Sequence, residues 1–89
     1  MRITYSKDAD VLYLSFTPPM GRVASVENAN GDILRIDTSS GTIIGVTIQL
    51  FMYRISTGEK IEVPEIGFST SSPMGASIVE NLQVRANCA

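Results

Sequence analysis

The sequence contains no histidine and no tryptophan, and Cys88 is its only cysteine. Catalytic centres built from Ser-His-Asp or Cys-His are therefore excluded, as are zinc sites that contain histidine. A single thiol forms neither an internal disulfide nor a thiolate metal site, and such cysteine usage is typical of a reducing compartment. The phosphate-cradling patterns G-x-x-x-x-G-K-[ST] and G-x-G-x-x-G are absent as well. We expect no cofactor.

Long hydrophobic runs are also missing. No stretch approaches the roughly 20 apolar residues that span a bilayer, and the N-terminus lacks the apolar core of a signal peptide. We therefore expect a cytoplasmic protein that does not bind membranes. Nucleic-acid-binding proteins usually gather their basic residues on one face, so we expect no direct contact with DNA or RNA. The basic residues stand singly along the chain: Arg2, Lys7, Arg22, Arg35, Arg54, Lys60 and Arg85.

The most informative stretch is residues 33–48, which has the pattern of a β-hairpin. Leu34 and Ile36 alternate with polar residues, and Ile44, Val46 and Ile48 alternate with Gly or polar residues. A side-chain period of two is typical of strands with one buried face. The polar connection at residues 37–41 suits a type I turn that places Gly41 in the left-handed region.

Other segments fit strands and helices laid against this hairpin. Proline ends the second strand because it cannot donate to a ladder, and the Asn-Gly pair at residues 30–31 favours a hairpin turn. Helical spacing and a terminal glycine favour a helix over residues 49–56, with a continued strand as the alternative. The predicted strands cover residues 2–5, 11–16 and 22–28, in addition to the two strands of the hairpin.

The C-terminal third is harder to interpret. Residues 59–64 are typical of a short edge strand, and residues 65–75 have the Gly, Ser, Thr and Pro content of a loop. Ser77 and Glu80 match a capping box before a helix over residues 77–86, although the alternation in this segment also fits a strand.

The sequence predicts an α+β fold: a small antiparallel sheet of four to six strands with one short helix after the last core strand, followed by a C-terminal arm. We assign residues 1–58 to this sheet-plus-helix domain and residues 59–89 to an extension. A chain of 89 residues buries only about 60–65% of its unfolded surface. An open sheet with one helix would leave apolar surface uncovered, so we expect a homo-oligomer, a dimer or larger.

Three acidic residues are the candidate site. If the turn that carries Asp8 and Asp10 lies beside the turn that begins at Asp37, their carboxylates could bind Mg²⁺ or Ca²⁺ or act as an acid–base pair. The alternative is that each carboxylate accepts hydrogen bonds from backbone N–H groups of its own turn. Tyr5 and Tyr13 alternate with aliphatic residues and are expected to pack in the core or across strands. Gly45 is expected to permit close packing by the helix or a slight bulge.

Two segments resemble a known family. Residues 5–14, from Tyr5 through Asp10 to Leu14, resemble its opening pattern Y-x-x-x-x-D-x-L-Y-I. Residues 33–48 resemble its second pattern, a hydrophobic strand that ends in Asp, here Asp37, followed by D-G-x-L-V-G-I-E-I. The family is DUF2283, a small bacterial and archaeal domain of unknown function, and the resemblance covers roughly residues 2–55.

The resemblance implies a small antiparallel sheet flanked by a helix, and an antitoxin-like or partner-binding role, because some relatives are encoded beside small toxin-like proteins. Thr47 and Arg35 depart from the pattern, since both stand where acidic residues are common. If the family's acidic cluster binds a ligand, this chain has lost part of that cluster.

Three functions are consistent with the sequence. The first is a non-enzymatic protein-interaction module, self-associating and binding a protein partner through its C-terminal extension. The second is a small metal-binding protein or enzyme that uses Asp8, Asp10 and Asp37. The third is a self-assembling structural protein without a small ligand.

Overall fold

The predicted hairpin is present as strands β4 (Ile33–Asp37) and β5 (Thr42–Gln49). The structure is a computed structural model, and it describes residues 1–87. The chain divides into two compact units, Met1–Phe51 and Met52–Ala89. The first unit contains the hairpin together with three further strands: β1 (Arg2–Ser6), β2 (Val11–Ser15) and β3 (Val23–Glu27).

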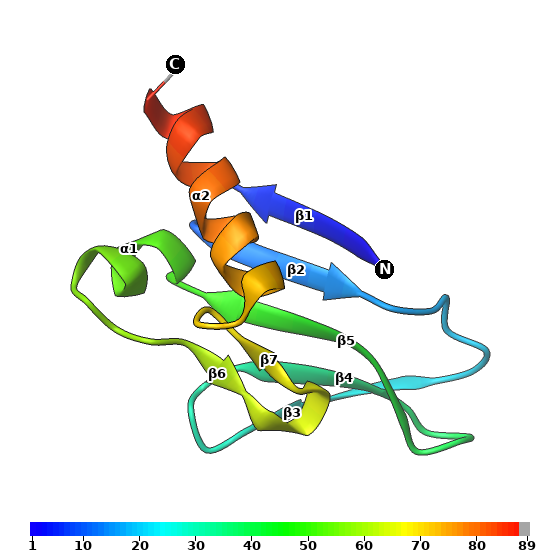
Figure 1. Cartoon of the computed structure of the whole chain (residues 1–89). Helices are drawn as coiled ribbons and strands as arrows, with labels where there is room; N and C mark the ends of the chain where they lie inside the picture. Colours follow the sequence, from blue (N-terminus) through cyan, green and yellow to red (C-terminus); the bar gives the residue numbers. More distant parts are fainter. Residues whose placement is uncertain (88–89) are drawn as a thin grey trace. The chain divides into compact units, whose positions relative to one another are not determined.

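These strands form one five-stranded antiparallel sheet in the order β1-β2-β5-β4-β3 (Figure 1). The last strand in the sequence, β5, is therefore the central strand, with the β1–β2 hairpin on one side and the β3–β4 hairpin on the other. The sheet and the helix that follows β5 confirm the predicted α+β class. Strands β1 and β3 are the two edges.

One face of the sheet is apolar. A single row crosses it from edge to edge, because the register aligns Ile3 with Leu14, Leu14 with Val46, Val46 with Leu34, and Leu34 with Val26. Leu14, Val46 and Leu34 are 1%, 1% and 6% exposed. The predicted alternation is therefore correct, and it places the hairpin residues in the core.

The turns follow the predicted chemistry with one difference. Gly41 takes a positive φ of 73°, and its N–H donates to the Asp37 carbonyl. In the β3–β4 loop only Gly31 is left-handed, because the Asn28 side chain organises the loop instead. Its Oδ1 accepts the backbone N–H groups of Asn30 and Asp32, which is the geometry of an Asx turn.

A bulge interrupts the β4–β5 pairing beside Gly45. Arg35 pairs with Gly45 whereas Ile36 pairs with Ile43, so Ile44 is the extra residue. A Cβ on Gly45 would lie 2.9 Å from the Leu14 carbonyl oxygen. Gly45 is thus required by the close approach of β2, and the predicted bulge is present.

The predicted helix after the hairpin is present as α1 (Phe51–Ser56). The alternative, a strand that continues through this segment, is wrong because β5 ends at Gln49. Gly58, with a φ of 86°, ends the helix as predicted. The N–H of Gly58 donates to the Ile55 carbonyl, and the N–H of Glu59 donates to the Arg54 carbonyl, which is a Schellman motif.

The second unit contains more regular structure than the sequence predicts. Strands β6 (Glu62–Val63) and β7 (Phe68–Ser69) form a small antiparallel pair, joined by the 3₁₀ helix η1 (Pro64–Ile66) and Gly67. The prediction of a loop throughout residues 65–75 is therefore wrong. The buried side chains of this unit include Ile61, Val63 and Phe68.

The chain continues as helix α2 (Pro73–Asn87), so the helical alternative for the C-terminal segment is correct. It begins four residues before the predicted start, and the capping-box prediction is wrong: Ser77 lies inside the helix. The Ser72 hydroxyl accepts the N–H of Gly75 and donates to the Ser69 carbonyl, so Ser72 is the N-cap. No helix of the described residues is long and apolar enough to cross a membrane.

Candidate functional site

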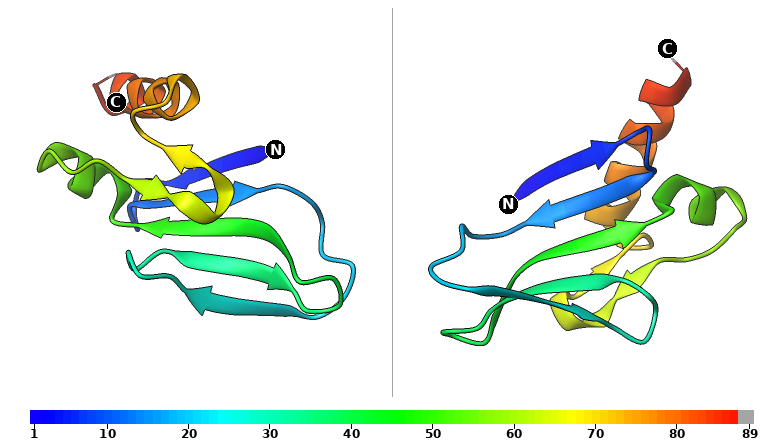
Figure 2. Two further views of the ribbon diagram at one scale, coloured as in Figure 1. Left: turned by 60° about the horizontal axis from the view of Figure 1, so that its bottom comes forward. Right: turned by 180° about the vertical axis from the view of Figure 1, so that it is seen from behind.

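At one end of the sheet, the carboxylate of Asp37 accepts hydrogen bonds from two different loops. Its Oδ2 accepts the backbone N–H of Met20 at 3.0 Å, and its Oδ1 accepts the N–H and the hydroxyl of Ser39 at 2.9 and 2.5 Å. The β2–β3 loop and the β4–β5 turn are thereby joined, and they lie side by side in both views of Figure 2. The N–H and the hydroxyl of Thr38 also donate to the Arg22 carbonyl.

Asp37 is only 2% exposed, yet its hydrogen bonds favour the charged carboxylate. The Ser39 hydroxyl has the largest effect, followed by the backbone N–H groups of Met20, Ser39 and Ser40, and together they lower the pKa of Asp37 below its ordinary value. The site thus holds a fixed negative charge that is already satisfied by donors of this chain.

The opposite end of the sheet holds the Tyr5–Asp10 pair. The Tyr5 hydroxyl donates to Asp10 Oδ1 at 2.7 Å, and the N–H of Phe51 donates to the Asp10 carbonyl. Asp10 has a φ of 55°, a conformation that Asp tolerates better than most residues. Burial, together with the hydrogen bond to the Asp10 carboxylate and its charge, raises the pKa of Tyr5 to about 12.

The three acidic candidates do not form one site. Asp10 precedes Val11, which pairs with Gln49 at the end of β5, whereas Asp37 pairs with Thr42 at its beginning. The length of β5 separates them by roughly 20 Å. Asp8 is exposed in the turn before Asp10. Among the described residues, no three or more Asp, Glu, His or Cys side chains are grouped so that they could hold a metal ion.

The two tyrosines expected to pack lie on opposite faces of the sheet. Tyr5 pairs with Leu12 on the apolar face and is half-buried, while Tyr13 pairs with Thr4 and Thr47 on the other face. Tyr13 is 40% exposed. It therefore takes part in cross-strand pairing rather than in the core.

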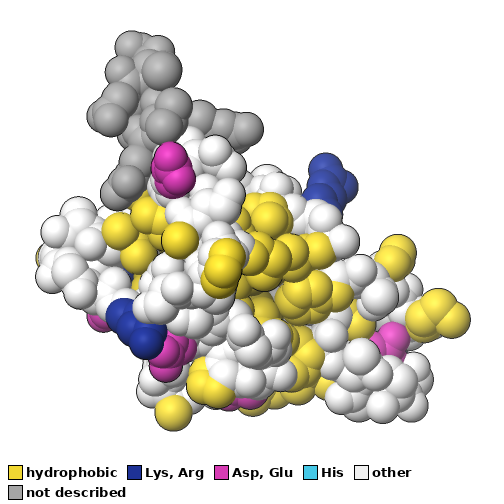
Figure 3. Space-filling view, viewed as in Figure 1, with side chains coloured by type: hydrophobic (Ala, Val, Ile, Leu, Met, Phe, Trp, Pro, Cys, Tyr) yellow, Lys and Arg dark blue, Asp and Glu magenta, His cyan; other side chains and the backbone are white. Residues whose placement is uncertain are grey.

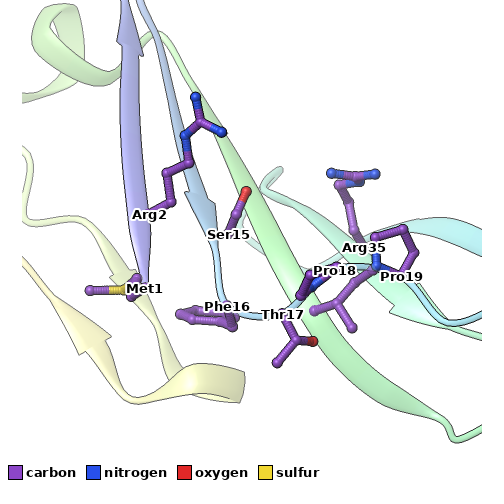
Figure 4. Close-up of a pocket in the computed structure, with 9 residues that line it drawn as sticks. Met1, Arg2, Ser15, Phe16, Thr17, Pro18, Pro19 and Arg35 are labelled. Atoms are coloured by element: carbon purple, nitrogen blue, oxygen red, sulfur yellow. The ribbon is translucent and has the colours of Figure 1, made fainter.

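That second face, the polar face, carries a groove that the sequence did not reveal. The register places Arg2 opposite Ser15, Ser15 opposite Gly45, and Gly45 opposite Arg35, so all four lie in one row across the sheet. The groove has a volume of about 510 Å³, and Phe16, Pro18, Pro19 and Ile44 are among the residues that line it. In Figure 4 the side chains of Arg2, Ser15 and Arg35 extend to the same side of the sheet.

Elsewhere the charged side chains are dispersed. In the view of Figure 3 the basic side chains stand apart from one another, and hydrophobic side chains reach the surface at the end that carries the β2–β3 loop. Met20 in this loop is 90% exposed. The ion pairs Arg54–Glu59 and Lys60–Glu62 are local contacts in the second unit.

These features define a small α+β domain built on a five-stranded antiparallel sheet, with hydrogen-bonded carboxylates at both of its ends. The family model of DUF2283, described as a protein of unknown function, matches residues 2–49, more than half of the chain. The chain therefore belongs to the DUF2283 family. No curated protein and no solved structure matches it.

The structure explains several residues of the two sequence patterns. Tyr5 and Asp10 of the first pattern are hydrogen-bonded to each other. Asp37 of the second joins two loops, and Gly45 allows β2 to approach β5. These residues stabilise the fold. Arg35, which departs from the second pattern, lies on the polar face.

Proposed function

We propose that this DUF2283 protein is a non-enzymatic interaction module that self-associates through the free edge of β1. The observation that supports this is the apolar row across the sheet. Its three central residues are buried, but the residues at its ends, Ile3 on β1 and Val26 on β3, are 42% and 46% exposed. The apolar face thus reaches both edges without being covered there.

The β1 edge lacks the features that protect sheet edges from pairing. Its five residues contain no proline and no lysine, and Arg2 is its only charged residue. An unprotected edge strand presents unpaired N–H and C=O groups to a second chain. Adding a strand there would satisfy these groups and cover Ile3.

The sequence of β1 is compatible with antiparallel pairing to its own copy. In a register centred on Thr4, Ile3 of one copy lies opposite Tyr5 of the other, and Arg2 lies opposite Ser6. Aliphatic–aromatic cross-strand pairs are favourable, and this register opposes no like charges. The same operation on β3 would pair Val26 only with Ala24, which buries less apolar surface. We therefore assign the interface to β1.

The experiment is a molar-mass measurement by light scattering on the full chain over a wide dilution series. The wild type is expected to have the mass of a dimer, and Ile3→Lys the mass of a monomer. Val26→Lys is the matched control, because it places the same charge at the same row on the other edge, and it is expected to remain dimeric. A monomeric wild type, or dissociation by Val26→Lys alone, would contradict the assignment to β1.

We further propose that the module binds a second protein, in an antitoxin-like role. The motivation is the expectation attached to the family resemblance, since the family itself is described only as of unknown function. A tagged pull-down from the native cell should recover one dominant protein at fixed stoichiometry. Recovery of the chain alone would favour self-assembly without a partner.

A further inference from the structure

Two arginines, Arg2 and Arg35, lie on the polar face of a chain whose net charge is −2. Arg2 and Arg35 occupy the two ends of the row Arg2–Ser15–Gly45–Arg35, three strand spacings apart. With about 4.8 Å between neighbouring strands, their Cα atoms are about 14 Å apart. Two arginine side chains are long enough to approach one small ligand from both ends of such a row.

Neither guanidinium group is neutralised. Among the side chains that the structure describes, Arg54 and Lys60 have carboxylate partners, whereas Arg2 and Arg35 have none. Both are exposed residues on the same side of the sheet, as Figure 4 shows. Arginine presents a planar fork of donors that matches phosphate and carboxylate oxygens.

Between the arginines no side chain rises from Gly45, and the backbone of β2 packs closely against it. A Cβ there would lie 2.9 Å from the Leu14 carbonyl oxygen and 3.9 Å from the Arg35 Cδ, so the row has backbone rather than a side chain at this position. Ser15, next to Gly45 in the row, adds a hydroxyl that donates or accepts. The centre of the row therefore offers a polar floor between two cations.

One side of the groove is apolar. Phe16, Pro18 and Pro19 follow β2 directly, and Ile44 reaches the groove at the β5 bulge. A volume of about 510 Å³ is within the range of small-molecule sites. The groove thus combines charged groups for an anion with a surface for an apolar substituent.

We propose that this groove binds a small phosphate monoester that carries an apolar or aromatic group. Arg2 and Arg35 hold the phosphate oxygens from the two ends of the row, Ser15 donates a hydrogen bond, and the apolar group packs against Pro18 and Pro19, which lie beside Arg35 in Figure 4. The proposal does not depend on self-association, because the row lies within one sheet.

The test is an NMR titration of the ¹⁵N-labelled full chain with phenyl phosphate, alongside inorganic phosphate and phenol as half-ligands. Phenyl phosphate is expected to give saturable shifts at Ser15, Phe16 and Arg35, and to bind more tightly than either half-ligand. Shifts that are absent, that do not saturate, or that occur equally with inorganic phosphate would overturn the proposal.

Variants that remove one positive charge each distinguish binding in the groove from a general attraction of the anion to positive charge. Arg35→Gln and Arg2→Gln are each expected to weaken phenyl phosphate binding about tenfold, since a hydrogen bond to a charged group is lost. Arg22→Gln removes the same charge from an exposed loop residue that does not line the groove, and it should leave the affinity unchanged. Equal weakening by Arg22→Gln would overturn the proposal.

The same spectra report whether each variant is folded. If Arg35→Gln loses its dispersed spectrum, Arg35→Lys takes its place, because it retains the stem and the charge but not the fork. It is expected to weaken binding by a smaller factor than Arg2→Gln does. If the single variants Arg35→Lys and Arg2→Gln both bind phenyl phosphate as tightly as the wild type, the arginines have no role in binding and the proposal is overturned.

Discussion

The apolar row across the sheet predicts how the free energy of unfolding depends on position. Leu14 is 1% exposed, so Leu14→Ala removes a fully buried side chain and leaves a cavity. Such changes cost about 2–5 kcal/mol, a large share of the roughly 5–10 kcal/mol expected for a domain of this size. Ile3 lies next to Leu14 in the row but is 42% exposed. Ile3→Ala in the monomer should therefore cost only about 1 kcal/mol.

The measurement is urea unfolding followed by circular dichroism, at a concentration low enough to keep the chain monomeric. Thr4→Ala is the control, because Thr4 is adjacent to Ile3 but points to the polar face, and it should change the free energy by less than about 0.5 kcal/mol. A cost below about 1 kcal/mol for Leu14→Ala would refute the assigned register. At dimer-forming concentrations, the cost of Ile3→Ala should increase.

Three further predictions concern hydrogen-bonded side chains. Asp10→Asn should lower the pKa of Tyr5 from about 12 toward its ordinary value, because it removes the neighbouring charge. Ultraviolet titration of tyrosinate measures this pKa, and Tyr5→Phe identifies the titration step that belongs to Tyr5. An unchanged pKa of Tyr5 in Asp10→Asn would contradict the prediction. The raised pKa also means that the stability contributed by Tyr5 is complete below pH 10 and is lost as the pH rises toward 12. The lowered pKa of Asp37 has the opposite sign: its stabilisation is present above its unfolded pKa of 3.8 and is lost as the pH falls through the folded value. Asp37→Asn should therefore destabilise the protein at neutral pH and weaken the loss of stability in acid, and parallel acid-unfolding curves for variant and wild type would disprove this. Ser72→Ala should cost about 1 kcal/mol in thermal unfolding because it removes the α2 cap, whereas Ser77→Ala should cost almost nothing, and the reverse order would restore Ser77 as the cap.

The sheet could be predicted because its information is local. Alternation in the hairpin, the left-handed glycine at position 41 and the glycine after α1 each act within a few residues, and each matches the structure. Even the bulge is consistent with Gly45 inside a strand pattern. Such features depend on backbone sterics and on a period of two, which a sequence displays directly.

The structure of the second unit is harder to predict, because its sequence carries fewer local patterns. Strands β6 and β7 have two residues each, too few for a period to be visible. Several serines precede the C-terminal apolar run, Ser72 and Ser77 among them, and the sequence does not distinguish their roles. Ser72 is the cap because Gly75, whose added Cβ would lie 1.9 Å from the Ser69 carbonyl oxygen, allows the helix to begin there.

The candidate site depended on strand order, which no local pattern supplies. Asp10 and Asp37 were expected to converge on the condition that their turns were neighbours, but the register places them at opposite ends of β5. Arg2 and Arg35 are far apart in the sequence, but the sheet places them in one row. The pairing of strands that are distant in the sequence therefore separates the two acidic residues and aligns the two arginines.

The central position of β5 has a consequence for how the chain folds. The β1–β2 and β3–β4 hairpins connect neighbours in the sequence, but β2 meets β5 only across the whole β3–β4 hairpin. Closing so large a loop costs entropy before any contact compensates for it, so joining β2 to β5 is the expected slow step of folding. During synthesis on the ribosome, the sheet cannot be completed until β5 has emerged. Until then the chain carries two hairpins whose inner edges are exposed, and β5 removes both of these edges at once.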